Sequence, residues 1–97
     1  MKNVLIDSQL SNKINDYVYQ YARENLISKW TIGSTDKDIC QAILESCTIV
    51  GMTKISESTG LNRSHLYRAF GPNGNPTLST VMTIIKYFGL QFKVETI

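Results

Sequence analysis

Apolar residues recur three and four positions apart through most of this chain, as they do along one face of an α-helix. The first such stretch predicts a helix that begins at a cap, Ser8 or Ser11, and runs to about Trp30. Its apolar positions are Leu10, Ile14, Tyr17, Val18, Tyr21, Ala22 and Leu26. Before it lies a short apolar segment, residues 4–6, which is either an edge strand or a tail that packs on a partner.

The aromatic residues of this first stretch allow three interpretations. Tyr17 and Tyr21 share a helix face at i and i+4, while Tyr19 lies opposite. One interpretation is a stacking platform for nucleic acid, and another is a partner surface, since Tyr and Trp are enriched in interfaces. The pattern favours the third interpretation, a core stripe with one exposed ring.

A second helix follows the break at residues 31–35 and begins at Thr35 or Asp36. Its apolar stripe consists of Ile39, Ile43, Cys47 and Val50, with Gly51 at its end. Cys40 and Cys47 are seven positions apart, about 10 Å along a helix, which is too far for a disulfide. We therefore expect two reduced core thiols in a cytoplasmic protein.

Residues 52–70 predict two short helices, 53–59 and 63–70, that meet at a tight corner. Gly60 stands at the corner, and Asn62 is a good N-cap for the second helix. The apolar positions that would hold the pair on a common core are Ile55, Leu61, Leu66 and Phe70. This pattern is typical of a helix-turn-helix motif, whose second helix lies in the major groove of DNA.

The second of these helices carries four polar side chains on one predicted exposed face. They are Arg63, Ser64, Tyr67 and Arg68. Arginine suits the O6 and N7 atoms of guanine, and Tyr67 suits a phosphate or a thymine methyl group. The pattern favours DNA contact over a merely solvated face, and it leaves open which residues touch bases and which touch phosphates.

Further candidate DNA contacts lie outside this face. Thr53 and Lys54 begin the preceding helix, where free backbone N–H groups favour a phosphate; an ordinary helix start is the alternative. Asn73 and Asn75 are either turn-forming residues, which the pattern favours, or phosphate donors, and His65 is expected to pack. The complete set of predicted DNA-binding residues is Thr53, Lys54, Asn62, Arg63, Ser64, Tyr67, Arg68, Asn73 and Asn75.

The remainder of the chain predicts a loop, a helix and a strand. Residues 71–76 hold two prolines and two glycines, and a helix then starts at Thr77 or Ser79 and is closed by Gly89. Its apolar positions are Leu78, Val81, Met82, Ile84, Ile85 and Phe88. Residues 90–97 alternate apolar and polar, as in a β-strand. Because the unpaired N–H and C=O groups of a strand edge favour pairing with another strand, we expect this strand to pair with its copy in a homodimer.

The positions of the charged residues say more about function than the net charge does. The net charge of +2 is only weakly basic, but the single acid between Gly51 and Pro76, Glu57, is outnumbered. The cationic or potentially cationic residues of that segment are Lys54, Arg63, His65 and Arg68. An enzyme is not expected, because the single His has no catalytic partner at a recognisable spacing. We also expect no metal, no cofactor and no membrane-spanning segment.

Three segments, residues 60–70, 74–80 and 90–94, together resemble the probable addiction-module antidote family, which are HigA-like antitoxins. The resemblance covers residues 36–94 and is not identified for residues 1–35. Two departures stand out: Phe70 replaces the usual leucine, and His65 replaces a commonly acidic or small residue. These changes would retune the operator sequence and leave the fold intact.

The resemblance implies a mainly α fold, a λ-repressor-like helix-turn-helix bundle of about five helices with the C-terminal β-strand. From the pattern along the chain we expect residues 36–97 to form the DNA-binding domain with its dimerisation strand. Residues 1–35 would be an N-terminal tail and helix, and partner binding is one role open to this extension. The resemblance further implies a cytoplasmic antitoxin that neutralises a RelE/HigB-like toxin and represses its own operon on double-stranded operator DNA. Two alternatives remain: a phage Cro-like regulator without a toxin, and a protein-interaction module that has lost DNA binding.

Overall fold

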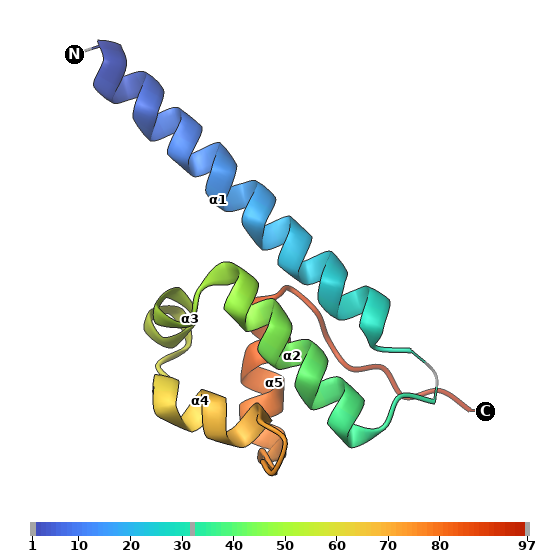
Figure 1. Ribbon diagram of the computed structural model, residues 1–97. Helices are drawn as coiled ribbons and strands as arrows, with labels where there is room; N and C mark the ends of the chain where they lie inside the picture. Colours follow the sequence, from blue (N-terminus) through green and yellow to red (C-terminus); the bar gives the residue numbers. More distant parts are fainter. Residues whose placement is uncertain (1, 32, 97) are drawn as a thin grey trace.

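The computed structural model describes residues 2–31 and 33–96, with side-chain surroundings from residue 15 onward. The described residues form five helices and no strand, so the mainly α class is confirmed. The helices are α1 (Lys2–Lys29), α2 (Asp36–Val50), α3 (Met52–Thr59), α4 (Arg63–Phe70) and α5 (Leu78–Tyr87) (Figure 1). None of the described helices is long and apolar enough to cross a bilayer.

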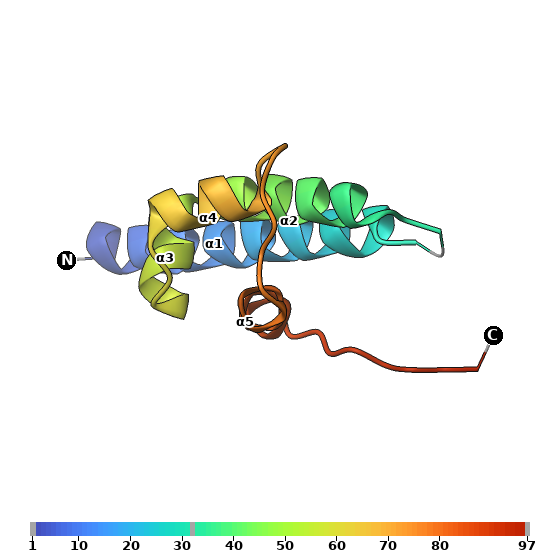
Figure 2. The same cartoon turned by 90° about the horizontal axis from the view of Figure 1, so that it is seen from below.

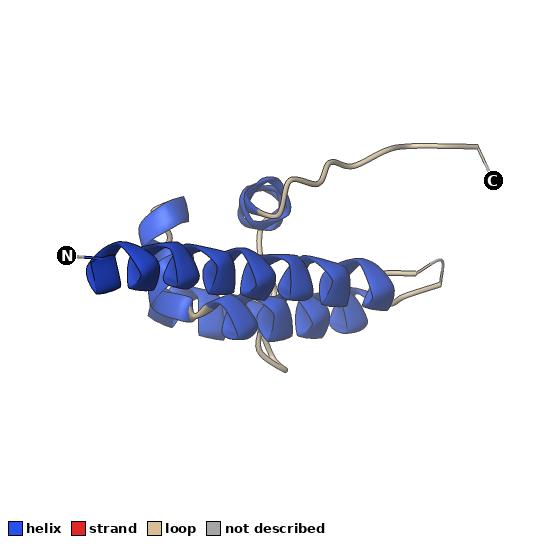
Figure 3. Ribbon diagram, turned by 90° about the horizontal axis from the view of Figure 1, so that it is seen from above, coloured by secondary structure: helices blue, strands red, loops and turns tan. Residues whose placement is uncertain are grey.

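Helix α1 lies alongside α2 (Figure 3), and its N-terminal half projects beyond the other helices (Figure 1). The predicted start at Ser8 or Ser11 is wrong, because the helix already begins at Lys2. The prediction of an edge strand at residues 4–6 is wrong for the same reason. Since α1 contains no proline or glycine, nothing in its backbone ends the helix early.

Helix α1 buries the face that carries Ala22 and Leu26, both 0% exposed. Tyr19 lies on the same side, where its ring stacks on Phe88 with the ring centroids 5.9 Å apart. The Tyr19 hydroxyl donates to the backbone carbonyl of Tyr87 at 3.0 Å. This part of α1 is therefore held against both α2 and the end of α5.

The other two tyrosines of α1 face solvent, since Tyr17 is 75% and Tyr21 65% exposed. The predicted core stripe with a single exposed ring is wrong, because both residues lie outside the stripe and Tyr19, on the opposite face, packs into it. Apolar residues occupy both sides of this helix, so their spacing alone does not select the side that the other helices cover.

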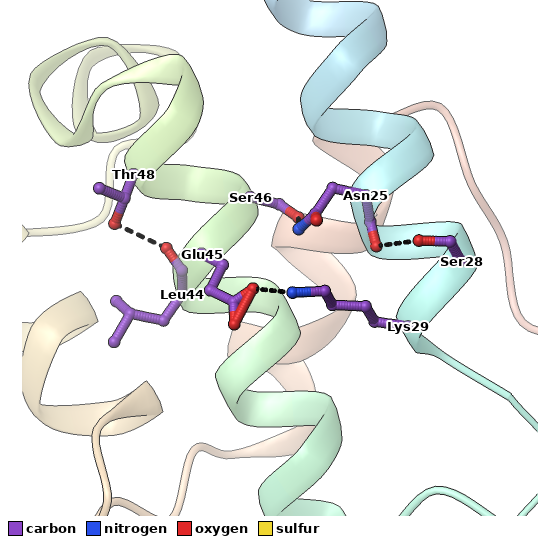
Figure 4. A network of polar contacts seen from close by, with 7 residues as sticks. All are labelled: Asn25, Ser28, Lys29, Leu44, Glu45, Ser46 and Thr48. Atoms are coloured by element: carbon purple, nitrogen blue, oxygen red, sulfur yellow. Dashed lines mark hydrogen bonds and ion pairs between the residues drawn. The ribbon is translucent and has the colours of Figure 1, made fainter.

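A row of polar contacts joins α1 to α2 (Figure 4). The side-chain amide of Asn25 donates to the hydroxyl of Ser46, which is fully buried, at 3.2 Å. On the same side Lys29 forms an ion pair with Glu45. The hydrogen bond from Lys29 holds the pKa of Glu45 below its ordinary value. These contacts fix how the two helices lie along one another.

Helices α2 to α5 enclose one apolar core together with α1. Its fully buried members include Ile43, Cys47, Ile55, Leu66, Ile84 and Phe88. Leu78 and Met82, which the pattern assigned to the apolar positions of α5, are instead 69% and 39% exposed. They lie on the side of α5 that faces away from this core.

From residue 35 onward, the helices begin close to the residues that the sequence predicts. Thr35 caps α2, and its side chain accepts from the backbone N–H of Asp38 at 3.1 Å. The Asp38 carboxylate accepts in return from the Thr35 N–H at 3.0 Å, and these bonds hold the pKa of Asp38 below its ordinary value. Thr77 caps α5 in the same way, accepting from the N–H of Thr80 at 3.2 Å. Thr35 and Thr77 are thus the capping residues among the predicted alternatives.

The predicted C-terminal β-strand is not seen. Residues 90–96 run as an irregular tail that leads away from α5 and from the corner between α3 and α4 (Figure 2), and position 97 lies outside the described residues. Only its first part is attached: Phe92 contacts Trp30 with the ring centroids 5.7 Å apart, whereas Val94 is 97% exposed. A strand needs a neighbour with free backbone groups, and the internal candidate, residues 4–6, is helical.

Candidate nucleic-acid interface

Helices α3 and α4 meet at a corner made by Gly60, as the sequence predicts. Gly60 has a φ of +76°, in the left-handed region that favours glycine, and its N–H donates to the carbonyl of Ser56 at 2.9 Å. The Ser56 hydroxyl donates across the corner to the carbonyl of Leu61. On the inner side, Ile55 and Leu66 are 0% and 1% exposed. The two helices are therefore locked at a fixed angle.

Helix α4 begins at its predicted cap. The side-chain oxygen of Asn62 accepts from the backbone N–H of His65 at 3.3 Å. The helix turns Leu66, Ala69 and Phe70 into the core. His65 is half-buried, in keeping with the packing role expected for it. The short helix is thus fixed at its start and along its inner face.

The opposite face of α4 is exposed. It carries the four residues that the pattern selected, Arg63, Ser64, Tyr67 and Arg68, and Tyr67 has 52% of its surface exposed. Within the part of the chain that the structure describes, neither arginine takes part in an ion pair. Their charges are therefore available to a ligand on this face, and DNA contact by them stays a prediction.

One hydrogen bond joins the two helices of the motif on the exposed side. The guanidinium of Arg63 donates from Nη1 to the hydroxyl of Thr53 at 2.9 Å. Sequence reasoning named both residues without finding this contact, because residues ten positions apart meet only through the corner angle. The bond brings the start of α3 beside the start of α4.

The start of α3 has no side-chain cap. Gly51 is at once the last cap of α2 and the first cap of α3, with a φ of +110°, and it has no side chain to accept from the first N–H groups. Thr53 and Lys54 in this first turn are both exposed. The uncapped first turn leaves backbone N–H groups beside the positive charge of Lys54, and phosphate contact here stays a prediction.

The loop between α4 and α5 packs tightly on the last turn of α4. A Cβ atom on Gly74 would lie 2.1 Å from the carbonyl oxygen of Ala69, so only glycine fits. Asn73 and Asn75 are exposed, and neither side chain has a hydrogen bond to another residue that the structure describes. The role of these two side chains as turn formers or phosphate donors remains a prediction.

The two thiols have environments that suit packing. Burial raises the pKa of Cys47 to about 12, and burial followed by the charge of Asp36 raises the pKa of Cys40. Cys40 lies in the wall of a cleft of about 690 Å³ between α2, the loop of residues 71–76 and Phe92. Because the thiolate is the reactive form, neither thiol is prepared for nucleophilic chemistry.

Comparison with known proteins places most of the chain in one family. Residues 10–96 match the family model described as probable addiction module antidote protein. An uncharacterized protein of Haemophilus influenzae (strain ATCC 51907 / DSM 11121 / KW20 / Rd) is 43% identical over 44 residues, which are 45% of this chain and 45% of that protein. No solved structure matches. Since the family match extends over the helix-turn-helix and most of α1, the chain belongs to the probable addiction module antidote proteins.

Proposed function

We propose that this protein is the antitoxin of a type II toxin-antitoxin module and a sequence-specific repressor of the operon that encodes it. Membership in an antidote family implies a toxin partner and supports the antitoxin role. The further assignments, a RelE/HigB-like toxin, operator DNA and autoregulation, rest on the resemblance and on the α3–α4 corner. A Cro-like regulator without a toxin and a module without DNA binding are the alternatives that experiment must exclude.

The observation that carries the DNA-binding part is the division of α4 into two faces. One face is anchored by Leu66 and Phe70, at 1% and 2% exposure, and the other presents Arg63 and Arg68. A rigid helix with cations on its free side matches the requirement for reading bases in the major groove. The first turn of α3 and the residue 71–76 loop flank it, in positions suited to phosphate contacts.

Arg63 and Arg68 differ in how freely they can move. The bond to Thr53 restrains the Arg63 guanidinium, whereas Arg68 has no hydrogen bond to another described side chain. A restrained guanidinium loses less conformational entropy when it binds. We therefore assign Arg63 to a fixed contact near the start of α4 and Arg68 to a contact that adapts to the operator.

A homodimer is the assembly that best suits this site, because a single α4 reaches only one half-site. The tail of residues 90–96 offers the contact: its backbone groups beyond Leu90 have no ladder partner among the described residues. A second copy laid antiparallel would supply that ladder, and only then would the tail become a strand. Light scattering on the full chain at micromolar concentration should give the dimer mass, and a monomer would contradict this assembly.

The decisive experiment measures binding to the chain's own upstream region. The change is Arg63→Ala with Arg68→Ala, and each lost base contact should cost about 1–3 kcal/mol of binding free energy. Both residues are exposed, so circular dichroism should stay native. The matched control is Lys37→Ala, which removes an exposed cation from α2. A gel shift in which the double variant binds as tightly as the wild type would contradict the assignment of α4.

Salt provides a second readout in the same experiment. Lys54, Arg63 and Arg68 occur twice in a dimer, so several phosphates should be neutralised and affinity should fall steeply with ionic strength. Rescue of growth in cells that express the toxin tests the antitoxin role separately. A chain that binds its operator and rescues no toxin would be the regulator without a toxin partner.

A further inference from the structure

The outer face of α1 is an exposed surface with two neighbouring tyrosines that the fold does not use. We define it as Asp16, Tyr17, Gln20, Tyr21 and Glu24, all of which are exposed. Its two tyrosines are neighbours at i and i+4, and 75% and 65% of their surfaces are in solvent. Two large rings side by side on a solvated helix face point to a binding surface, because tyrosine is enriched in protein interfaces.

The opposite face of α1 already carries the contacts that hold the bundle together. Tyr19 donates to the carbonyl of Tyr87, and Arg23 donates from Nε to the carbonyl of Phe88 at 2.8 Å. Leu26 is fully buried, and Lys29 pairs with Glu45. Stability of the bundle therefore gives no reason for tyrosines on the outer face.

The two tyrosines lie about one helical turn apart, which is the spacing of side chains by which a helix binds in a groove. Figure 1 shows α1 along the outside of the bundle, with α2 on one side of it, so a partner could approach the outer face of α1.

Charge identifies the kind of partner. Asp16 and Glu24 are the charged residues of the outer face, while the two basic residues of α1 from residue 15 onward, Arg23 and Lys29, contact the bundle. An acidic border around an aromatic row suits a groove with a basic border. A second copy suits it less well, because an antiparallel pairing of the tyrosines would bring Asp16 of one chain near Glu24 of the other.

We propose that the outer face of α1 binds the toxin, by laying Tyr17 and Tyr21 into an apolar groove that is bordered by basic side chains. The inference rests on the proposed antitoxin function and adds the surface that performs it. It also separates the two activities in space, since DNA would be bound by the α3–α4 corner and the toxin by α1. One chain could then hold both ligands at once.

The test uses full-length protein and, as probe, the purified toxin encoded in the same module. Tyr17→Ala with Tyr21→Ala should weaken toxin binding about tenfold or more, because aromatic anchors dominate interfaces. The matched control is Leu78→Ala with Met82→Ala, which removes another exposed apolar pair at i and i+4, on α5. The control should bind toxin like the wild type, and both variants should keep native circular dichroism and operator affinity.

Charge reversal provides an independent variant. Asp16→Lys with Glu24→Lys should weaken toxin binding at low salt, and the loss should shrink as salt screens the charges. If the wild type binds no toxin, the proposed function fails and this inference fails with it. If the wild type binds and the tyrosine variant binds equally well, only the inference is overturned. It is also overturned if the tyrosine substitutions halve the molecular mass in light scattering and leave toxin affinity unchanged.

Discussion

The α3–α4 corner and helix α1 obey the same physical rules, yet only the corner could be placed from its own residues. In the corner, Gly60 and Asn62 are signals that act on their immediate neighbours, and the chain has eight residues in each helix. A left-handed glycine and an N-cap fix the ends of such short helices within a residue. Local and tertiary preferences agree there.

Helix α1 lacks such local signals within its length. It runs for 28 residues without proline or glycine, and it carries apolar residues on two opposite sides. One side packs because Phe88 and the helix α2 happen to lie there, and the other presents Tyr17 and Tyr21 to solvent. The difference teaches that periodicity reports how many apolar faces a helix has, while the packing partners decide which one is buried.

The largest loss of stability should come from removing a buried apolar side chain, either from α4 in the corner or from α1. Leu66→Ala in α4 and Leu26→Ala in α1 each remove a side chain that is at most 1% exposed, so each should cost about 2–5 kcal/mol of unfolding free energy. Tyr21→Ala on the outer face of α1 should change it by no more than about 0.5 kcal/mol. Urea unfolding followed by circular dichroism measures all three. A large loss for Tyr21→Ala would mean that the outer face supports the fold.

Most of the fold could be read from the sequence where a backbone requirement has a residue signature. The corner at Gly60, the cap Asn62 and the loop at residues 71–76 all follow from such signatures, and the sequence narrows the cap of α2 to Thr35 or Asp36. The candidate DNA face followed as well, because the inner residues of α4 are apolar and the outer ones polar. Its contact between Thr53 and Arg63 could not be read, since it depends on the angle between two helices.

The tail of residues 90–96 shows where a sequence pattern does not predict the structure. Residues 90–96 have the alternation of a strand, but a strand is a property of two segments and not of one. Residues 4–6, the segment that the sequence offered as a partner, continue α1 instead. The alternation therefore describes what the tail can pair with and not how it lies within one chain.

A smaller loss of stability is expected when a helix cap is removed, and it tests whether the predicted caps act as caps. Asn62→Ala removes the side chain that accepts from the His65 N–H, so it should cost about 0.5–2 kcal/mol of unfolding free energy. Ser11, which the pattern offered as a cap for the first helix, lies within α1. Ser11→Ala should therefore leave stability unchanged or raise it slightly, because alanine is the better helix former. Thermal unfolding compares the two. Equal losses would mean that Ser11 has a capping role after all.

The smallest effect concerns the ion pair that joins α1 to α2. The pKa of Glu45 is lowered in the folded chain, chiefly by the hydrogen bond from Lys29. A lowered carboxyl pKa stabilises the fold above the ordinary pKa of glutamate, and this contribution is lost as the pH falls through the folded value. Both side chains are partly in solvent, so Lys29→Ala should cost no more than about 1 kcal/mol at neutral pH.

Lys29→Ala should match the wild type once the pH is low enough to protonate Glu45. The control is Lys37→Ala, whose lysine forms no ion pair with another described residue, and its difference from wild type should stay flat with pH. Urea unfolding at a series of pH values between acid and neutral gives the comparison. If the Lys29 difference persists unchanged into acid, the contact between α1 and α2 depends on the packed stem of the lysine and not on its charge. The relative placement of the two helices would then depend on this packing and on the hydrogen bond from Asn25 to Ser46, and not on the charges of the ion pair.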